Sequence, residues 1–305
     1  MRNVPLCSVS IDLDEIACYL QIHSLKSTGS IRPVYDIALT RIRRFAADHA
    51  VPLTLFVVAR DLDRAQNVTQ LATLVADGHE IGNHSLDHFY DLTRRGRGEQ
   101  EFQIRNANQR IADLLGVTPT GFRAPGYTVT DQLLNVVAES GLRYDTSVFP
   151  CPAYFAAKAA RLFGMRLRDT PSSAILDSPR VLAAPRVPYR IGHPYWRVGQ
   201  GLLELPIQVA GAARMPFIGT SLSMLGPRAA QMLTRLLVGA PFINLELLGI
   251  DFLDSHDVPS ELRAVQPDLR IPLARKLETF AAVFAVLRDG GYTMVRLDEA
   301  AQQFE

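Results

Sequence analysis

Two histidines spaced four residues apart follow a short apolar run that ends in glycine. His84 and His88 lie in the segment EIGNHSLDH, residues 80–88. If this segment turns helically, residues four apart share one face, and both imidazoles can point the same way. Imidazole is a common ligand of divalent metals, although many such pairs bind nothing. The rest of the sequence has to decide between these two interpretations.

Two aspartates end the first strand-like run of the chain. Asp12 and Asp14 are two residues apart in SIDLDE, so on a strand they face the same side. Two carboxylates on one face repel each other unless a positive charge lies beside them. One carboxylate and two imidazoles, with open positions for water and substrate, make up a catalytic zinc-type site. The second aspartate is then free to act as a general base on metal-bound water.

Segments typical of strands and helices alternate along most of the chain and would position these residues. The predicted strands are 6–12, 53–59, 79–84, 120–126 (strand, then loop), 142–147, 202–209, 241–250 and 292–297. The predicted helices are 35–49, 68–78, 99–116, 130–141, 228–239 and 272–291. This alternation of strands and helices favours parallel βαβ units, in an α/β barrel or an open doubly wound sheet. No repeat or linker divides it, so we expect a single domain over residues 1–305.

Ionisable residues recur at the ends of successive predicted strands. Asp12 ends the first strand, His84 follows the third, Arg123 follows the next and Asp145 the one after. In barrel enzymes the loops after the strands converge on the active site. Each placement alone has a plain structural explanation, since Arg123 could lie at the surface and Asp145 could cap a turn. Their joint recurrence favours a metal site.

The alternation of strand-like and helix-like segments is interrupted at residues 150–200, which contain many prolines and arginines. We predict a long irregular excursion over the surface, which in a compact domain is usually functional. Tyr195 and Trp196 lie there between arginines and suit the apolar face of a sugar ring, or else anchor the loop. Residues 154–167 have the pattern of a basic amphipathic helix, which would allow contact with a membrane surface.

Composition excludes several classes of protein. A net charge of +1, without long runs of like charge, argues against nucleic acid as a partner. Three widely spaced cysteines favour neither a disulfide framework nor a cysteine zinc site. No apolar run reaches the ~18 residues of a membrane span. From these features we expect a soluble, cytoplasmic protein, with peripheral membrane contact left open; the oligomeric state does not follow from the sequence.

Four short segments together resemble a known family. SIDLDE (10–15), HSLDH (84–88), FRAPGY (122–127) and YDTS (144–147) stand in the order and approximate spacing of the polysaccharide deacetylase family, the NodB-homology enzymes of carbohydrate esterase family 4. The D-x-D spacing is similar to the branch with intracellular deacetylases and lipid-linked sugar deformylases. The resemblance implies a distorted (β/α) barrel of about seven strands and one divalent metal, with zinc the expected ion and cobalt or nickel alternatives.

The resemblance also implies roles for the residues at the strand ends. Asp12 corresponds to the catalytic base. Asp14, His84 and His88 correspond to the three metal ligands. Arg123 corresponds to the arginine that pairs with the base and orients it.

Two further motifs carry substrate-binding and supporting roles by the same resemblance. Pro125 and Tyr127 correspond to the groove wall, where a backbone N–H can help to hold the oxyanion. Asp145 and Ser147 correspond to the motif that supports the arginine.

One position departs from the family pattern. The family supplies a late histidine as the general acid, but the matching strand, within 243–254, carries Leu248 there. Glu246 lies on the same face of that strand and is costly to bury without a partner. It is either a substitute acid or substrate contact, or a structural carboxylate paired with an arginine. His256 lies a few residues further on and is expected to be a solvated loop residue.

The sequence therefore predicts a metal-dependent amide hydrolase. It would remove an acetyl or formyl group from an amino sugar or a sugar-linked, even lipid-linked, substrate. One alternative is a deacetylase-like binding protein impaired by Leu248. Another is a hydrolase of a non-sugar amide on the same fold.

Overall fold

The computed structural model describes residues 4–25, 32–170 and 172–305. Its centre is a curled sheet that, in these residues, has nine strands in the order β10–β1–β2–β3–β4–β5–β7–β6, with β11 beside β1. Those strands are β1 Leu6–Asp12, β2 Leu53–Val57, β3 Glu80–Asn83, β4 Gly121–Phe122, β5 Tyr144–Asp145, β6 Tyr189–Ile191, β7 Val198–Glu204, β10 Phe242–Leu248 and β11 Thr293–Met294. A separate antiparallel pair is formed by β8 Val209–Ala210 and β9 Met215–Pro216.

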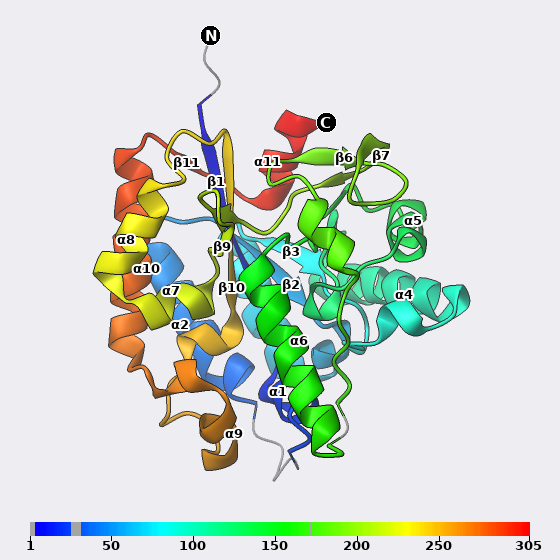
Figure 1. Ribbon diagram of the computed structural model, residues 1–305, viewed down its shortest axis with the longest axis horizontal. Coiled ribbons are helices and arrows are strands. Elements are labelled where there is room, and N and C mark those ends of the chain that lie inside the picture. Colours follow the sequence, from blue (N-terminus) through cyan, green and yellow to red (C-terminus); the bar gives the residue numbers. More distant parts are fainter. Residues whose placement is uncertain (1–3, 26–31, 171) are drawn as a thin grey trace.

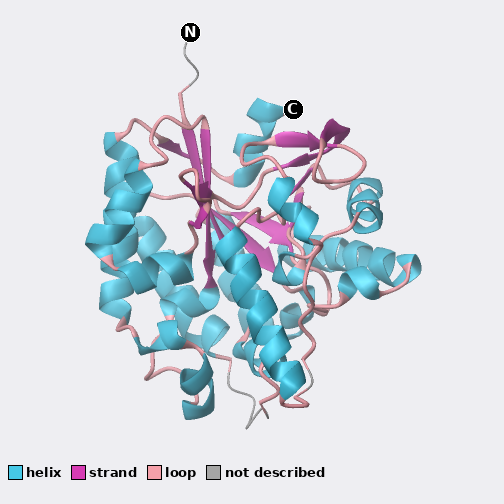
Figure 2. Cartoon of the chain, in the orientation of Figure 1, coloured by secondary structure: helices cyan, strands magenta, loops and turns pink. Residues whose placement is uncertain are grey.

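Helices surround the sheet (Figure 2). The α-helices are α1 Ile16–Ile22, α2 Leu39–Asp48, α3 Ala65–Ala76, α4 Arg97–Leu115, α5 Asp131–Glu139, α6 Pro152–Leu167, α7 Gly219–Leu225, α8 Pro227–Arg235, α9 Ser260–Val265, α10 Leu273–Asp289 and α11 Leu297–Phe304. Short 3-10 or π turns are η1 Val34–Ala38, η2 Ala59–Asp63, η3 Leu92–Arg94, η4 Pro125–Tyr127, η5 Pro179–Ala183, η6 Gly249–Phe252 and η7 Pro267–Arg270. In Figure 1, α8 and α10 lie on the left of the strands, α4 and α5 on the right, and α6 runs in front of them.

The strands that carry the predicted site are parallel and buried on both faces. All seven residues of β1 are buried, as are all five of β2 and all four of β3. Parallel strands covered by helices read as continuous apolar runs, which is why these segments stand out in the sequence. The sheet becomes antiparallel only at its edge, where β6 pairs with β7.

The predicted fold class, a distorted (β/α) barrel, is confirmed as a curled α/β sheet that stays open between β10 and β6. Within the segment 150–200, the helix predicted at 154–167 is confirmed as α6, whereas β6 and the start of β7 make the rest more regular than we predicted. Helix α1 was not predicted, because its seven residues give too short a pattern to recognise. In the described part of the chain, no helix combines the length and the apolar character that crossing a membrane requires.

Gly82 on β3 allows an aromatic ring of β2 to pack against the strand. A Cβ built on Gly82 would lie 2.5 Å from a ring carbon of Phe56. That ring is fully buried and has the guanidinium carbon of Arg123 4.5 Å from its centroid. Glycine at this position is therefore required by close approach, and the residue sets the position of a ring beneath the predicted site.

We expect Gly82→Ala to lower the free energy of unfolding by about 1–3 kcal/mol, because the added methyl overpacks the space held by Phe56. Urea unfolding would measure this. The matched control is Gly98→Ala on α4, where a Cβ would meet nothing within 4 Å. Equal stability of the two variants would contradict the packing argument.

Candidate functional site

The carboxyl ends of the parallel strands bring the predicted residues together. Asp12, the last residue of β1, is in register with Phe56 on β2 and with Leu248 on β10. On the other side of β2, Asn83 precedes His84 and pairs with Phe122, the residue before Arg123. Segments more than a hundred residues apart therefore end at one place, as expected for loops that follow parallel strands.

Asp14, His84 and His88 form a compact group of possible metal ligands. Their ligand atoms all lie within 4.8 Å of one another, and all three residues are buried. Asp14 Oδ1 is 3.0 Å from His84 Nε2 and 3.1 Å from His88 Nε2, yet none of these atoms has a hydrogen-bond partner. Ligands about 2.0 Å from a tetrahedral zinc lie roughly 3.3 Å apart. The three orphaned, converging atoms therefore fit a divalent ion.

The His84 ring is held in the orientation that a metal ligand needs. Its Nδ1 lies 2.7 Å from the carbonyl oxygen of Arg123, so this nitrogen carries the hydrogen and Nε2 keeps its lone pair. The loop is fixed as well, since Asn83 accepts a hydrogen bond from the N–H of Ser85, and the Ser85 hydroxyl accepts one from the N–H of His88. Ser85 and His88 both have positive φ, at 65° and 54°. Such strain in residues other than glycine tends to occur at functional sites.

Electrostatics make this group receptive to positive charge. Burial alone would raise the pKa of Asp14, but His88 and His84 bring it below its ordinary value. Burial would lower the pKa of each imidazole, but the carboxylate of Asp14 raises both, that of His88 to about 10. A site that favours added protons so strongly also favours a divalent cation.

Asp12 lies beside this group and is held by a buried arginine. Arg123 Nη1 donates to Asp12 Oδ1 at 2.8 Å, and both side chains are almost completely buried. The other carboxylate oxygen, Oδ2, is 3.9 Å from His84 Nε2. The ion pair therefore fixes one oxygen of Asp12 and leaves the second oxygen directed to the possible metal position.

The remaining donors of Arg123 are satisfied by residues that the sequence reasoning missed. Its Nη2 donates to the hydroxyls of Ser10 and Thr146, and its Nε donates to the carbonyl oxygen of Thr146. Asn244 on β10 also donates to the Thr146 hydroxyl, at 2.8 Å. Hydroxyl side chains carry no distinctive chemical signal in a sequence, although Thr146 lies between two residues that we did select.

Asp145 and Ser147 lie behind the arginine. Asp145 accepts hydrogen bonds from the N–H and the hydroxyl of Ser147, and that hydroxyl accepts one from the N–H of Ala124. The carboxyl of Glu204 is hydrogen-bonded to Asp145, and burial raises the pKa of both groups. Asp145 thus caps its own turn and shapes the loop next to Arg123, while Thr146 makes the direct contact with the guanidinium.

A cavity of about 350 Å³ opens in front of the two aspartates. Tyr127 and Leu248 line it together with Asp12 and Asp14, whereas Pro125 is buried behind its wall. The remaining lining residues come mainly from α1, α6 and the start of α7, and they include Tyr19, Ile22, Tyr90, Gly126, Ala153, Tyr154, Ala157, Pro216, Ile218, Thr220, Ser221 and Gln266.

Glu246 reaches this cavity only through a tyrosine. The Tyr127 hydroxyl is 2.7 Å from Glu246 Oε1, and Glu246 is completely buried without lining the cavity. Burial, followed by the charge of Asp12, raises the pKa of Glu246 well above its usual range, which favours its protonated form. The structural alternative of a direct pair with an arginine is not what the structure shows. His256 is exposed, as expected.

Two predicted substrate contacts lie away from the cavity, and we correct them here. Tyr195 is buried in a second hydrophobic cluster, where its hydroxyl contacts Asp177 and its N–H donates to Asp131. Trp196 packs against the same cluster beside Arg180. These aromatic residues anchor their loop, Tyr195 through its hydrogen bonds within the fold and Trp196 by packing against the cluster.

Comparison with known proteins adds a family to this geometry. Residues 38–144 match the family model described as polysaccharide deacetylase. Over this part of its length the chain is similar to the polysaccharide deacetylases. It is 37% identical over 98 residues to a chitooligosaccharide deacetylase of Sinorhizobium fredii, which is 32% of this chain and 44% of that protein. It is 22% identical over 152 residues to a peptidoglycan deacetylase of Helicobacter pylori, covering 48% and 51%.

Solved structures of polysaccharide deacetylases share the fold. A probable polysaccharide deacetylase from Pseudomonas aeruginosa superposes with a TM-score of 0.60 at 14% identity, covering 98% of this chain and 90% of that one. A Mycobacterium smegmatis protein provisionally described in the same way gives 0.59 at 16% identity, with 99% and 91% covered. The sequence matches span about half or less of the curated relatives, so the likeness over the whole chain is one of fold.

We expect the purified protein to contain about one divalent ion per chain, and the His84→Ala/His88→Ala variant to contain none. Mass spectrometry of the metal content would measure both, after supply of zinc. His256→Ala is the control, since its side chain is exposed and remote from the group. Equal metal in the double variant and the wild type would show that the ion binds elsewhere.

Replacing Thr146 by valine should lower the free energy of unfolding by about 1–3 kcal/mol, because buried donors of Arg123 and Asn244 lose an acceptor. Thr146→Ser keeps the hydroxyl and serves as the matched control. Chemical denaturation would compare them. If serine were as destabilising as valine, the methyl group and not the hydroxyl would be the important feature.

Proposed function

We propose that this protein is a metal-dependent hydrolase that removes an acetyl or formyl group from an amino sugar or a sugar-linked amide. The observation that carries the proposal is the convergence of Asp14, His84 and His88 beside an aspartate that is already oriented by Arg123. The relatives named for chitooligosaccharide and peptidoglycan deacetylation support the same reaction class. We further propose that residues 1–305 act as one catalytic domain.

Asp14, His84 and His88 would hold the ion, most readily zinc. A divalent ion in such a site lowers the pKa of water and polarises a carbonyl oxygen. Asp12 would take the proton of the attacking water on Oδ2, since Arg123 occupies Oδ1. The arginine keeps this carboxylate in place and its charge stabilised within a dry interior.

The leaving amine needs a proton, and Tyr127 is placed to provide it. Tyr127 lines the cavity and its hydroxyl donates to Glu246 Oε1 at 2.7 Å, so a protonated Glu246 would restore the proton after transfer. Glu246 is thus a positioning and proton-holding residue, while Tyr127 would touch the substrate. This pair would take the role of the missing late histidine at position 248.

The cavity itself suits a sugar ring. Tyr19, Tyr90 and Tyr154 provide aromatic surface around a space of about 350 Å³, close to the aspartates. The faces of aromatic side chains bind the apolar faces of sugars. The hydroxyl groups of the sugar can meanwhile contact polar groups and solvent.

A second candidate function is a binding protein with weak or no turnover. Its support is Leu248, which is in register with Asp12 and lines the cavity where a general acid would be useful. Loss of general acid help costs about a hundredfold to ten-thousandfold in rate. A large gain of hydrolysis in Leu248→His would favour this candidate, and little gain would favour the Tyr127–Glu246 pair.

The test is release of free amine from N-acetyl and N-formyl amino sugars by the zinc-loaded protein, with acylated polyamines and cyclic ureides as non-sugar substrates. We expect turnover of the sugars and a fall in kcat of at least about a hundredfold in Asp12→Asn, with the metal content unchanged. A melting curve would verify that this variant folds. Undiminished turnover in Asp12→Asn, or turnover of the non-sugar amides alone, would contradict the proposal.

A further inference from the structure

A second chamber opens directly beside the cavity at the aspartates. It has a volume of about 250 Å³ and shares five wall residues with the first cavity, namely Ile22, Tyr90, Gly126, Tyr154 and Ala157. Its other walls are Lys158, Arg161 and Leu162 on α6, together with Ser172 and Ala174. A ligand that fills the first cavity can therefore extend into the second without leaving the protein.

Two cations, Lys158 and Arg161, line this chamber, and in the described part of the chain neither has a carboxylate oxygen within 4 Å; the carboxyl of Asp177 acts on Lys158 only from further away. Lys158 Nζ donates to the carbonyl oxygen of Gly126 at 2.9 Å, and burial lowers its pKa to about 8. Arg161 makes its one hydrogen bond among those residues with the ring of His23, and burial lowers its pKa too. Both groups are partly buried, so their charges are poorly screened by water.

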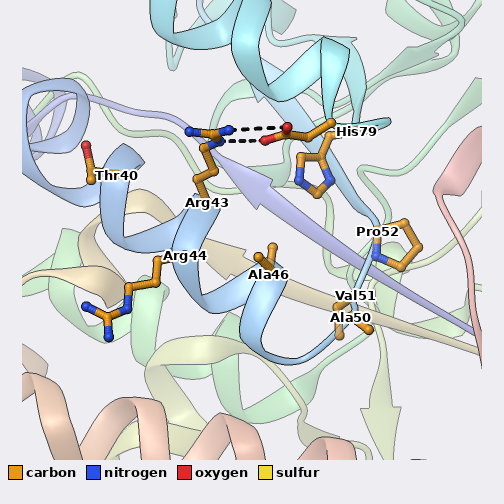
Figure 3. A pocket seen from close by; sticks show the side chains of 10 residues that line it. Thr40, Arg43, Arg44, Ala46, Ala50, Val51, Pro52 and His79 are labelled. Carbon is orange, nitrogen blue, oxygen red and sulfur yellow. Dashed lines mark hydrogen bonds and ion pairs between the residues drawn. The ribbon is translucent and has the colours of Figure 1, made fainter.

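A larger hollow elsewhere also has cations in its wall, but each of them has an acidic partner. It lies at the opposite, amino-terminal end of β2 and has a volume of about 610 Å³ (Figure 3). There Arg43 is paired with Asp77 at 2.5 Å, and Arg44 is paired with Asp48. The cations of the α6 chamber differ, because among the described residues no carboxylate forms a close ion pair with either of them, and only the more distant Asp177 acts on Lys158.

We infer that this chamber binds an oxyanion of the substrate, a phosphate or a carboxylate, while the amide lies in the neighbouring cavity. The inference rests on the proposed function and specifies its substrate class as an anionic N-acyl amino sugar. Arg161 offers a planar set of donors suited to a phosphate or carboxylate, and Lys158 adds a point charge. The hydroxyl-bearing Ser172 and the N–H-rich guanidinium line the same space.

The rest of the chamber indicates what accompanies the anion. Ile22, Leu162 and Ala174 make much of the wall apolar. A third hollow, of about 460 Å³, continues along α6 and shares Leu162, Ser172 and Ala174 with the chamber. The anion would therefore lie beside an apolar wall, and the space beyond it has a mixed wall that includes Arg94, Arg166 and Asp169.

Calorimetric titration of the zinc-loaded full chain tests the inference without requiring turnover. The ligands are N-acetylglucosamine, its 1-phosphate, its 6-phosphate and N-acetylmuramic acid, which carries a carboxylate. We expect at least one anionic ligand to bind about tenfold more tightly than the uncharged sugar, as one charge-assisted pair would provide. Arg161→Gln should reduce that preference to near one, and rising salt should weaken it in the wild type.

Arg168→Gln is the matched control, because Arg168 is exposed at the end of the same helix and lines neither cavity. It should keep the full preference. A decyl phosphodiester of the same sugar distinguishes a lipid-linked phosphate from a soluble one. Tighter binding of this ligand than of the 1-phosphate would identify a lipid-linked substrate. Equal affinity of the two ligands would identify a soluble one.

Equal binding of charged and uncharged sugars by the wild type would overturn the inference. A preference that persists in Arg161→Gln would overturn it too, because the anion would then bind elsewhere, for example at the metal. Hydrolysis assays on the same ligands test the proposed function separately from binding. If the uncharged sugar is hydrolysed but anionic ligands are not preferred, only the inference about the chamber is contradicted. If the preference depends on Arg161 but no ligand is hydrolysed, only the proposed catalysis is contradicted.

Discussion

The buried ion pair between Arg123 and Asp12 is the interaction on which the site depends. Burying an unpaired guanidinium would cost several kcal/mol, so the surrounding fold has to provide acceptors in fixed positions. It does so with three residues from two places, Asp12 and Ser10 on β1 and Thr146 just after β5. Arg123 also contributes its backbone carbonyl to His84, so one residue orients both the base and a metal ligand. The strand order of the sheet is what makes these contacts simultaneous.

Acidic groups crowd this centre, and their protonation keeps it from repelling itself. Glu204 and Asp145 are hydrogen-bonded to each other, which requires a shared proton, and burial raises the pKa of each. Burial also raises the pKa of Glu246. That leaves Asp12 and Asp14 as the carboxylates with positive partners close by, Arg123 for the first and the two histidines for the second. Paired charges remain ionised, and unpaired buried ones take up protons.

The sequence allowed the strands and the acidic and imidazole residues of the site to be predicted, because buried parallel strands are continuous apolar runs and their ends carry distinctive side chains. It did not predict Thr146 or Ser10, since a hydroxyl becomes important only through partners far away in the chain. Tyr195 and Trp196 were misplaced because aromatic residues in a loop serve equally to anchor it or to bind a ligand. The chamber on α6 could not be foreseen, since it depends on which cations the tertiary structure leaves unpaired.

The position of β1 in the sheet has a consequence for synthesis of the chain. Its neighbour β2 follows within about forty residues, but β10, on the other side, begins only at Phe242. Asp14, His84, His88, Arg123 and Thr146 all emerge from the ribosome before that. The metal-ligand group can therefore assemble early, while one edge of an entirely buried strand stays unpaired until the last fifth of the chain is made. Such an edge invites pairing with other chains. A nascent chain that stalls before β10 would be at its most aggregation-prone with its metal ligands already in place.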